Sequence, residues 1–325
     1  MPAGGVLDML NRSNRSRGRF VSVLGAVSTI VPFAILLAAT DPGVTITVKD
    51  LTPKFLAFYD RAIEQRASPD QRWELWKSLY HFAAVPPTPA GDNLARYLLD
   101  RAWPRYPSTI GRIRAGSSHV ATEAQRHVNV IAGLLHPEQD VHVELLVYVG
   151  GFEDNAFTAA HDNKITVAIP IESAPAVRER LMTHEFTHAV QIGMGSFSGS
   201  FQRTIGTIVI TEGLASRVTQ SVYPNRSETD SIEFTRGWLK EAEAHRREIL
   251  NGIRPYLASD TSADIQRFTI GPGPTGLERE AYYAGWLVIG HWLAQGMTFA
   301  DIARIPETEM PRRAAAAIEQ LLATR

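Results

Sequence analysis

One five-residue pattern limits what this chain can fold into more than any other feature. His184, Glu185 and His188 form a His-Glu-x-x-His motif within residues 178–191. On a helix, residues four positions apart lie one above the other on the same face, so both imidazoles can reach a common atom. Glu185 projects beside them. The spacing therefore predicts a helix whose two histidines bind a metal ion and whose glutamate acts on a water molecule at that ion.

The motif is short, so the predicted structure on either side of it has to support the interpretation as a metal site. With ten histidines in 325 residues, the chance of one such match in the chain is on the order of 1–2 %. Three strands are predicted directly before the motif, over residues 141–149, 155–159 and 164–171, because these segments are rich in β-branched or alternating apolar residues. We expect them to form a meander that leads into the helix, with Ser173 as its N-cap.

A third metal ligand is expected downstream, since two histidines leave a catalytic zinc site one protein ligand short. Glu212 is the only acidic residue between Glu185 and Glu228, and it lies in an apolar segment that predicts a second helix over 207–220. A lone carboxylate in such a helix is costly unless it is paired or bound to a metal. The alternatives are a buried glutamate paired with an arginine such as Arg217, or a glutamate that faces solvent.

These motifs resemble those of the gluzincin metallopeptidases. The resemblance rests on the His-Glu-Phe-Thr-His pentapeptide at 184–188 and on Glu212, 24 residues after the second histidine, within Thr-Glu-Gly-Leu-Ala. The Glu-Gly-Leu-Ala tetrad is similar to the Asn-Glu-Gly-Phe-Ala segment of aminopeptidases of that clan. It is more similar still to a family of bacterial predicted zinc-dependent proteases. The resemblance covers residues 141–220 and, more weakly, 275–295.

The resemblance implies an α+β, zincin-like (thermolysin-like) catalytic domain with a small antiparallel or mixed sheet and an active-site helix. It also implies one zinc ion bound by His184, His188 and Glu212. The chain departs from the family at Ser216, where thermolysin-like enzymes have an aspartate that orients the first histidine. Aminopeptidases of the clan bind the substrate N-terminus with a glutamate, and no residue of this chain is assigned to that role. Asn155 and Ala156 are expected at the edge of the cleft, where an extended peptide would pair with the backbone.

A hydrogen-bond donor for the transition state is expected near residue 282. Hydrolysis of a peptide bond places negative charge on the carbonyl oxygen, which a neutral donor can stabilise. Tyr282 and Tyr283 open an apolar helix, and a phenol stays protonated near neutral pH. The Tyr-x-x-Gly spacing from Tyr282 to Gly285 resembles that of the bacterial protease family, so Tyr282 is preferred. The alternative is that both tyrosines are core aromatic residues.

The first 40 residues predict an export signal or an N-terminal membrane anchor. A basic stretch over residues 1–19 precedes an uncharged run over 20–40, which is the arrangement expected with the basic flank on the cytoplasmic side. Cleavage after the small residues Ala38 and Ala39 and retention as an anchor both remain open. In either case we expect the remainder to be extracytoplasmic, secreted or held at the membrane through residues 20–40.

Composition excludes several other classes. The chain has no cysteine, so disulfides and thiolate zinc sites are excluded. Its formal net charge is −1 and no basic stripe is present, so no nucleic-acid partner is expected. We divide the chain into the N-terminal segment 1–40, a helical region over 41–140, and a zinc metallopeptidase domain over 141–325.

The function expected from the sequence is zinc-dependent hydrolysis of peptide bonds in a peptide or protein substrate, with Glu185 as general base. Two alternatives remain. One is a non-catalytic zinc-binding or partner-binding domain that retains the constellation. The other is a zinc hydrolase of a non-peptide substrate.

Overall fold

The computed structural model describes residues 43–86 and 88–323. The predicted signal or anchor at 20–40 lies outside them. Within the described residues, no helix combines the length and the apolar character needed to cross a bilayer. The described strands are β1 (Val44–Asp50), β2 (Val141–Tyr148), β3 (Phe157–His161) and β4 (Lys164–Pro170).

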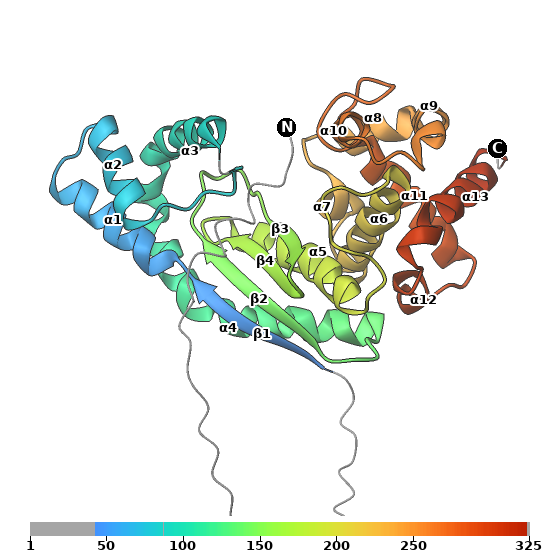
Figure 1. Cartoon of the computed structure of the whole chain (residues 1–325), viewed down its shortest axis with the longest axis horizontal. Coiled ribbons are helices and arrows are strands. Elements are labelled where there is room, and N and C mark those ends of the chain that lie inside the picture. Colours follow the sequence, from blue (N-terminus) through green and yellow to red (C-terminus); the bar gives the residue numbers. More distant parts are fainter. Residues whose placement is uncertain (1–42, 87, 324–325) are drawn as a thin grey trace, which may run out of the picture.

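Helices make up most of the described chain, which is of the mixed α+β class (Figure 1). Those before the sheet's second strand are α1 (Thr52–Glu64), α2 (Pro69–Leu79), α3 (Pro89–Ala102), the 3₁₀ turn η3 (Trp103–Arg105) and α4 (Tyr106–Leu135). Those after the sheet are α5 (Pro175–Gly193), α6 (Ile205–Val222), α7 (Glu228–Ile232), α8 (Trp238–Ala244), α9 (Arg246–Ile253), η4 (Arg254–Tyr256), α10 (Ser262–Thr269), α11 (Glu280–Ala294), α12 (Phe299–Ala303), η5 (Glu307–Glu309) and α13 (Met310–Ala323).

The sheet is mixed, with strand order β1-β2-β4-β3. β1 pairs parallel with β2, and β2 pairs parallel with β4, whereas β3 pairs antiparallel with β4. The meander expected from the sequence is therefore wrong. After β2 the chain passes to the outer edge to form β3, then turns at Asp162 and Asn163 and returns as β4 between them. Both turn residues have positive φ, 48° and 60°, as a tight hairpin turn requires.

The strand β1 differs from the sequence prediction, which gives a helical region over residues 41–140. Val44, Ile46 and Val48 alternate with the exposed residues Thr45, Thr47 and Lys49, which is the pattern of an edge strand with one covered face. β1 lies in register with β2 from Val44 opposite Val141 onward. The region before residue 140 thus contributes a strand to the sheet that supports the motif helix.

Two long helices pack on the sheet and on each other. α4 contacts β1 and α5, and α5 contacts β2, β3 and β4. In Figure 1, α1 to α3 lie at one side of the sheet and α6 to α13 at the other. The predicted N-cap is wrong in detail, because Ala174 occupies that position and Pro175 follows it. The Ser173 hydroxyl instead donates to Asp154 Oδ1 at 2.6 Å.

The closest helix contact joins α6 to α11 at two glycines. A Cβ atom on Gly213 would overlap the backbone of Gly285, and one on Gly285 would overlap the carbonyl oxygen of Val209. Only glycine permits two helix backbones to approach this closely. Because Gly213 follows Glu212 and Gly285 lies one turn after Tyr282, this crossing sets the positions of both candidate site residues.

We expect Gly213→Ala to lower the free energy of unfolding by about 1–3 kcal/mol, because the added methyl group must push α11 away or strain α6. Urea denaturation measures the change. Gly111→Ala is the matched control: it lies within α4, and a Cβ there meets no atom within 4 Å. It should leave stability unchanged or raise it by about 0.5–1 kcal/mol. Equal effects of the two substitutions would contradict the close-contact interpretation.

Candidate metal centre

The helix α5 has one apolar face and one polar face. Met182, Phe186, Ala189 and Val190 form the apolar face and are fully buried in the core. His184, Glu185 and His188 lie on the part of α5 that lines a cavity. Packing against the sheet therefore fixes the helix, and the helical period then directs the three chemically active side chains into the cavity.

Buried polar contacts attach α5 to α4. Arg178 on α5 donates through Nε and Nη2 to Glu123 Oε2, at 3.2 and 3.0 Å. Thr183 Oγ1 lies 3.1 Å from Nδ1 of His127, which is buried. Burial lowers the pKa of His127 from about 6.5 to about 4, so this histidine is neutral at pH 7. The two contacts hold α5 against α4.

Three ligand atoms converge on one point. Nε2 of His184 and Nε2 of His188 are 3.2 Å apart. Glu212 Oε2 lies 3.1 Å from the first nitrogen and 3.3 Å from the second. In a tetrahedral zinc site with ligand distances of about 2.0–2.1 Å, neighbouring ligand atoms are about 3.3–3.4 Å apart. The side chains therefore fit a metal ion with almost no rearrangement, and they form the one such group of three among the described residues.

Hydrogen bonding alone satisfies this arrangement poorly. A neutral imidazole carries one N–H. If both Nε2 atoms of His184 and His188 donate to Glu212, two hydrogens crowd together at the single oxygen Oε2. If one of the two Nε2 atoms accepts instead, the hydrogen on the other must be shared between that nitrogen and the carboxylate oxygen. Hydrogen bonds bent in this way are weak. A cation at the centre receives one lone pair from each ligand, so the donor set of two imidazoles and one carboxylate suits a first-row divalent metal.

Arg203 fixes the third ligand. Its Nη2 donates to Glu212 Oε1 at 2.7 Å, which leaves Oε2 for the histidines. Burial by itself would raise the pKa of Glu212. His188, His184 and Arg203 together outweigh it and hold the pKa well below its usual range. Glu212 is thus ionised, as a metal ligand must be.

Glu185 lies in the same cavity with a different environment. It is 8 % exposed, and burial raises its pKa above the usual range, although His184 and a hydrogen bond from Thr158 oppose this. The Thr158 hydroxyl lies 2.8 Å from Glu185 Oε2 and 2.9 Å from the Glu185 carbonyl oxygen. A carboxylate with a raised pKa is a stronger base than an exposed one.

The two candidate tyrosines, Tyr282 and Tyr283, lie in different surroundings. Tyr282 lines the cavity, and burial raises the pKa of its hydroxyl well above 10. Tyr283 is 2 % exposed and packs in a distinct apolar cluster with Trp238 and Trp286. Successive residues on a helix point about 100° apart, so both cannot face the same ion. The position of Tyr283 does not suit a donor at the metal, whereas that of Tyr282 does.

The predicted cleft edge lies where the sequence suggested. Asn155 and Ala156 line the cavity together with Phe157 and Thr158. The strand itself starts two residues later than expected, at Phe157, and β3 is the outer strand of the sheet. The Asn155 side chain donates to the carbonyl oxygen of Ala84 at 3.2 Å. The whole cavity has a volume of about 580 Å³.

At metal sites the ring nitrogen of a histidine that does not bind the metal is usually hydrogen-bonded to a carboxylate or a carbonyl oxygen. The Nδ1 atoms of His184 and His188 have no such hydrogen bond among the described residues. His188 Nδ1 is buried and has no hydrogen-bond partner. Ser216 lines the cavity, yet its hydroxyl makes no hydrogen bond to His184 among the described residues. The His188 ring instead packs edge-on against Phe197, with 6.3 Å between ring centroids. Packing, rather than a carboxylate partner, orients this ring.

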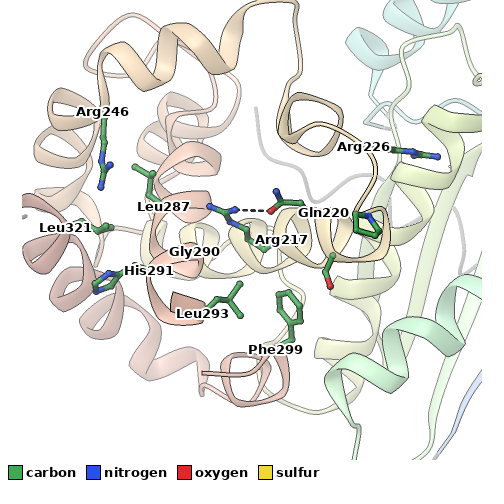
Figure 2. Close-up of a pocket in the computed structure, with 12 residues that line it drawn as sticks. Arg217, Gln220, Arg226, Arg246, Leu287, Gly290, His291, Leu293, Phe299 and Leu321 are labelled. Atoms are coloured by element: carbon green, nitrogen blue, oxygen red, sulfur yellow. Dashed lines mark hydrogen bonds between the residues drawn. The ribbon is translucent and has the colours of Figure 1, made fainter. Parts of the chain in front are cut away.

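A second cavity of about 610 Å³ lies between α6, α9, α11 and α13 (Figure 2). Arg217 points into it and donates to Gln220 Oε1 at 2.9 Å and to the Trp286 carbonyl oxygen at 3.0 Å. Its guanidinium also stacks on the Trp286 ring, 3.4 Å from the centroid. Arg217 is therefore not the partner of Glu212. The alternative of a buried glutamate paired with an arginine holds with a different arginine, because Arg203 lies 2.7 Å from Glu212 Oε1.

Sequence reasoning missed two residues of the site. Arg203 is the only Lys, Arg, Asp or Glu between Glu185 and Glu212, and that isolation was an available signal. Thr158 carried no signal, because a threonine in a strand is ordinary.

Comparison of the chain with models of protein families, with curated proteins and with solved structures found no match. The resemblance to gluzincins that the motifs suggest stays a prediction.

We expect one zinc ion to bind per chain and Glu212→Gln to weaken zinc binding by more than about 100-fold, because the site loses its only anionic ligand. Arg203→Gln should weaken it by about 10-fold, since Glu212 loses the contact that orients it. Competition with a chromophoric chelator measures both. Glu278→Gln is the matched control, an exposed carboxylate in the lining of the same cavity. Unchanged affinity in Glu212→Gln would exclude Glu212 as a ligand.

Proposed function

We propose that this protein is a zinc-dependent metallopeptidase with a zincin-like catalytic domain of the gluzincin type. The observation that carries the proposal is the triangle of ligand atoms from His184, His188 and Glu212, with sides of 3.1 to 3.3 Å. Glu185 and Tyr282 line the same cavity. A ligand triangle, a buried base and a neutral donor in one cavity are the parts that hydrolysis at a metal requires.

The donor set favours zinc. Two histidines and a glutamate are a known catalytic zinc set that leaves a coordination position for water or substrate. A zinc ion bound there would supply a Lewis acid that lowers the pKa of a water molecule and polarises the substrate carbonyl. His184, His188 and Glu212 would hold the ion, and Arg203 keeps Glu212 in the orientation that this requires.

Glu185 is the general base. Its carboxylate takes a proton from the attacking water and then passes this proton to the leaving nitrogen of the peptide bond. Burial raises the pKa of Glu185, which strengthens it as a base. The hydroxyl of Thr158 donates to Oε2 and so keeps the carboxylate in place during the transfer.

Tyr282 stabilises the negative charge that develops on the carbonyl oxygen. Its hydroxyl stays protonated because burial raises its pKa well above 10, so it donates a hydrogen bond at working pH. An extended peptide is the substrate that best fits the other wall. The outer edge of β3 offers unpaired backbone groups beside Thr158 and Phe157, and a peptide can add to such an edge as a further strand. An extracytoplasmic site of action, secreted or tethered by residues 20–40, is part of this proposal.

Glu185→Gln should leave zinc content near one ion per chain and reduce peptide hydrolysis by about 10²–10⁴-fold, because the amide cannot accept the proton. Hydrolysis of a quenched fluorescent peptide library, with and without a chelator, measures the loss.

Unchanged hydrolysis in Glu185→Gln would exclude the catalytic role. Full zinc content without hydrolysis of any peptide by the wild-type chain would favour a non-catalytic zinc domain. Hydrolysis of ester substrates alone would favour a non-peptide hydrolase.

Tyr282→Phe should lower kcat by about 10²–10³-fold, because one donor to the oxyanion is lost, with zinc affinity unchanged. Tyr283→Phe is the matched control, since Tyr283 packs in the neighbouring apolar cluster. Steady-state kinetics on one peptide substrate compares them. A larger loss in Tyr283→Phe than in Tyr282→Phe would reverse the assignment.

A further inference from the structure

Two arginines in the catalytic cavity have no acidic partner. Arg180, Arg203 and Arg279 line this cavity, and Arg203 is engaged by Glu212 at 2.7 Å. Neither Arg180 nor Arg279 makes an ion pair or a hydrogen bond through its side chain to any described residue. The guanidinium of Arg279 instead stacks on Phe234, 4.0 Å from the ring centroid, and lies 5.4 Å from that of Tyr282.

This arrangement is electrostatically unfavourable in the free protein. Both arginines are partly buried. Burial lowers the pKa of Arg180, and the positive charge of Arg279 acts in the same direction, while Asp154 and Asp230 oppose it from beyond ion-pair distance. Charges removed from water are normally paired. Two neighbouring guanidinium groups without a partner therefore favour an anionic group of the substrate at this place.

Acidic side chains in the same cavity leave Arg180 and Arg279 free to bind a carboxylate of the substrate. Glu153, Asp154 and Glu278 also line the cavity, but all three are exposed to solvent. Asp154 already accepts a hydrogen bond from Ser173 at 2.6 Å. Asp154 is the charge that acts most strongly on Arg180, but among the described residues none of these carboxylates lies within ion-pair distance of either arginine, and solvent screens exposed charges.

Both arginines lie one helical turn from the residues assigned to the chemistry. Arg180 precedes His184 by four residues on α5, and Arg279 precedes Tyr282 by three at the start of α11. One turn advances about 5.4 Å, whereas an extended peptide advances about 3.3 Å per residue. A carboxylate held by the arginines would thus belong to a residue within about two positions of the cleaved bond.

Because this inference concerns the substrate of the proposed site, it rests on the proposed function. We infer that Arg180 and Arg279 form a subsite for a carboxylate of the peptide substrate, so that this protein selects acidic peptides. The planar guanidinium groups can grip a carboxylate with two parallel hydrogen bonds. The carboxylate comes from an Asp or Glu side chain or from the C-terminus of the peptide.

Binding to the Glu185→Gln variant tests the subsite without depending on catalysis. Fluorescence anisotropy is measured with labelled peptides that carry Glu or Gln at one central position, each with a free or an amidated C-terminus. We expect the peptide with the recognised carboxylate to bind at least about tenfold more tightly than its neutral counterpart. Arg180→Gln and Arg279→Gln, each in the Glu185→Gln background, should remove this preference.

The two pairs of peptides distinguish the two sources of the carboxylate. A preference for Glu over Gln identifies an acidic side chain, and a preference for the free over the amidated end identifies the C-terminus. Arg246→Gln in the same background is the matched control, because Arg246 is exposed and lines the second cavity. It should retain the preference. Circular dichroism and zinc content verify that each variant is folded.

Equal binding of all four peptides, or a preference that survives both substitutions, would overturn the inference. Failure of the proposed function is a separate result, since it appears as the absence of peptide hydrolysis in the wild-type chain. Hydrolysis without acidic preference would leave the proposed function standing and remove the subsite. Arg180→Lys adds a further check: a carboxylate held by a two-point contact should be bound more weakly by the point charge of lysine.

Discussion

The contact of Gly213 with Gly285 is the constraint on which the candidate site depends. The proposed ligand Glu212 and the proposed donor Tyr282 come from two helices, and the two histidines of the candidate metal site come from a third, α5. Only the missing side chains at the crossing let α6 and α11 approach until both functional residues face the same cavity. A fold with any larger residue there would still form helices, but it would place Glu212 and Tyr282 farther apart.

Charge balance is the second constraint on this centre. Glu212 is buried among a guanidinium and two imidazoles, and Glu185 is buried nearby with a raised pKa. Two adjacent carboxylates thus have opposite shifts, set by their neighbours. Glu212 is held ionised, as the proposed ligand role requires, and Glu185 has the raised pKa that suits the proposed general base. Such a separation of pKa values within one cavity is characteristic of catalytic sites.

Much of the local structure followed from the sequence because its signals are local. The four-residue spacing of His184 and His188 placed both on one face of a helix, and the isolation of Glu212 in an apolar segment indicated that it is paired or bound to a metal. The order of the strands could not be read in this way. Whether β2 and β4 run parallel depends on where the chain places β3, and β1 pairs with a strand almost a hundred residues later. Such pairings are long-range and leave no mark in a window of sequence.

The sequence by itself determined the helical spacing of the two histidines and singled out Glu212 as the candidate third ligand of the proposed metal site. The tertiary structure alone decided that Arg203 rather than Arg217 holds Glu212 and that Tyr282 rather than Tyr283 faces the cavity. It also decided that Arg180 and Arg279 have no acidic partner among the described residues. The physical reason is that spacing within one helix is set by backbone geometry. Contacts between elements depend instead on how closely their backbones approach, which here is decided at two glycines.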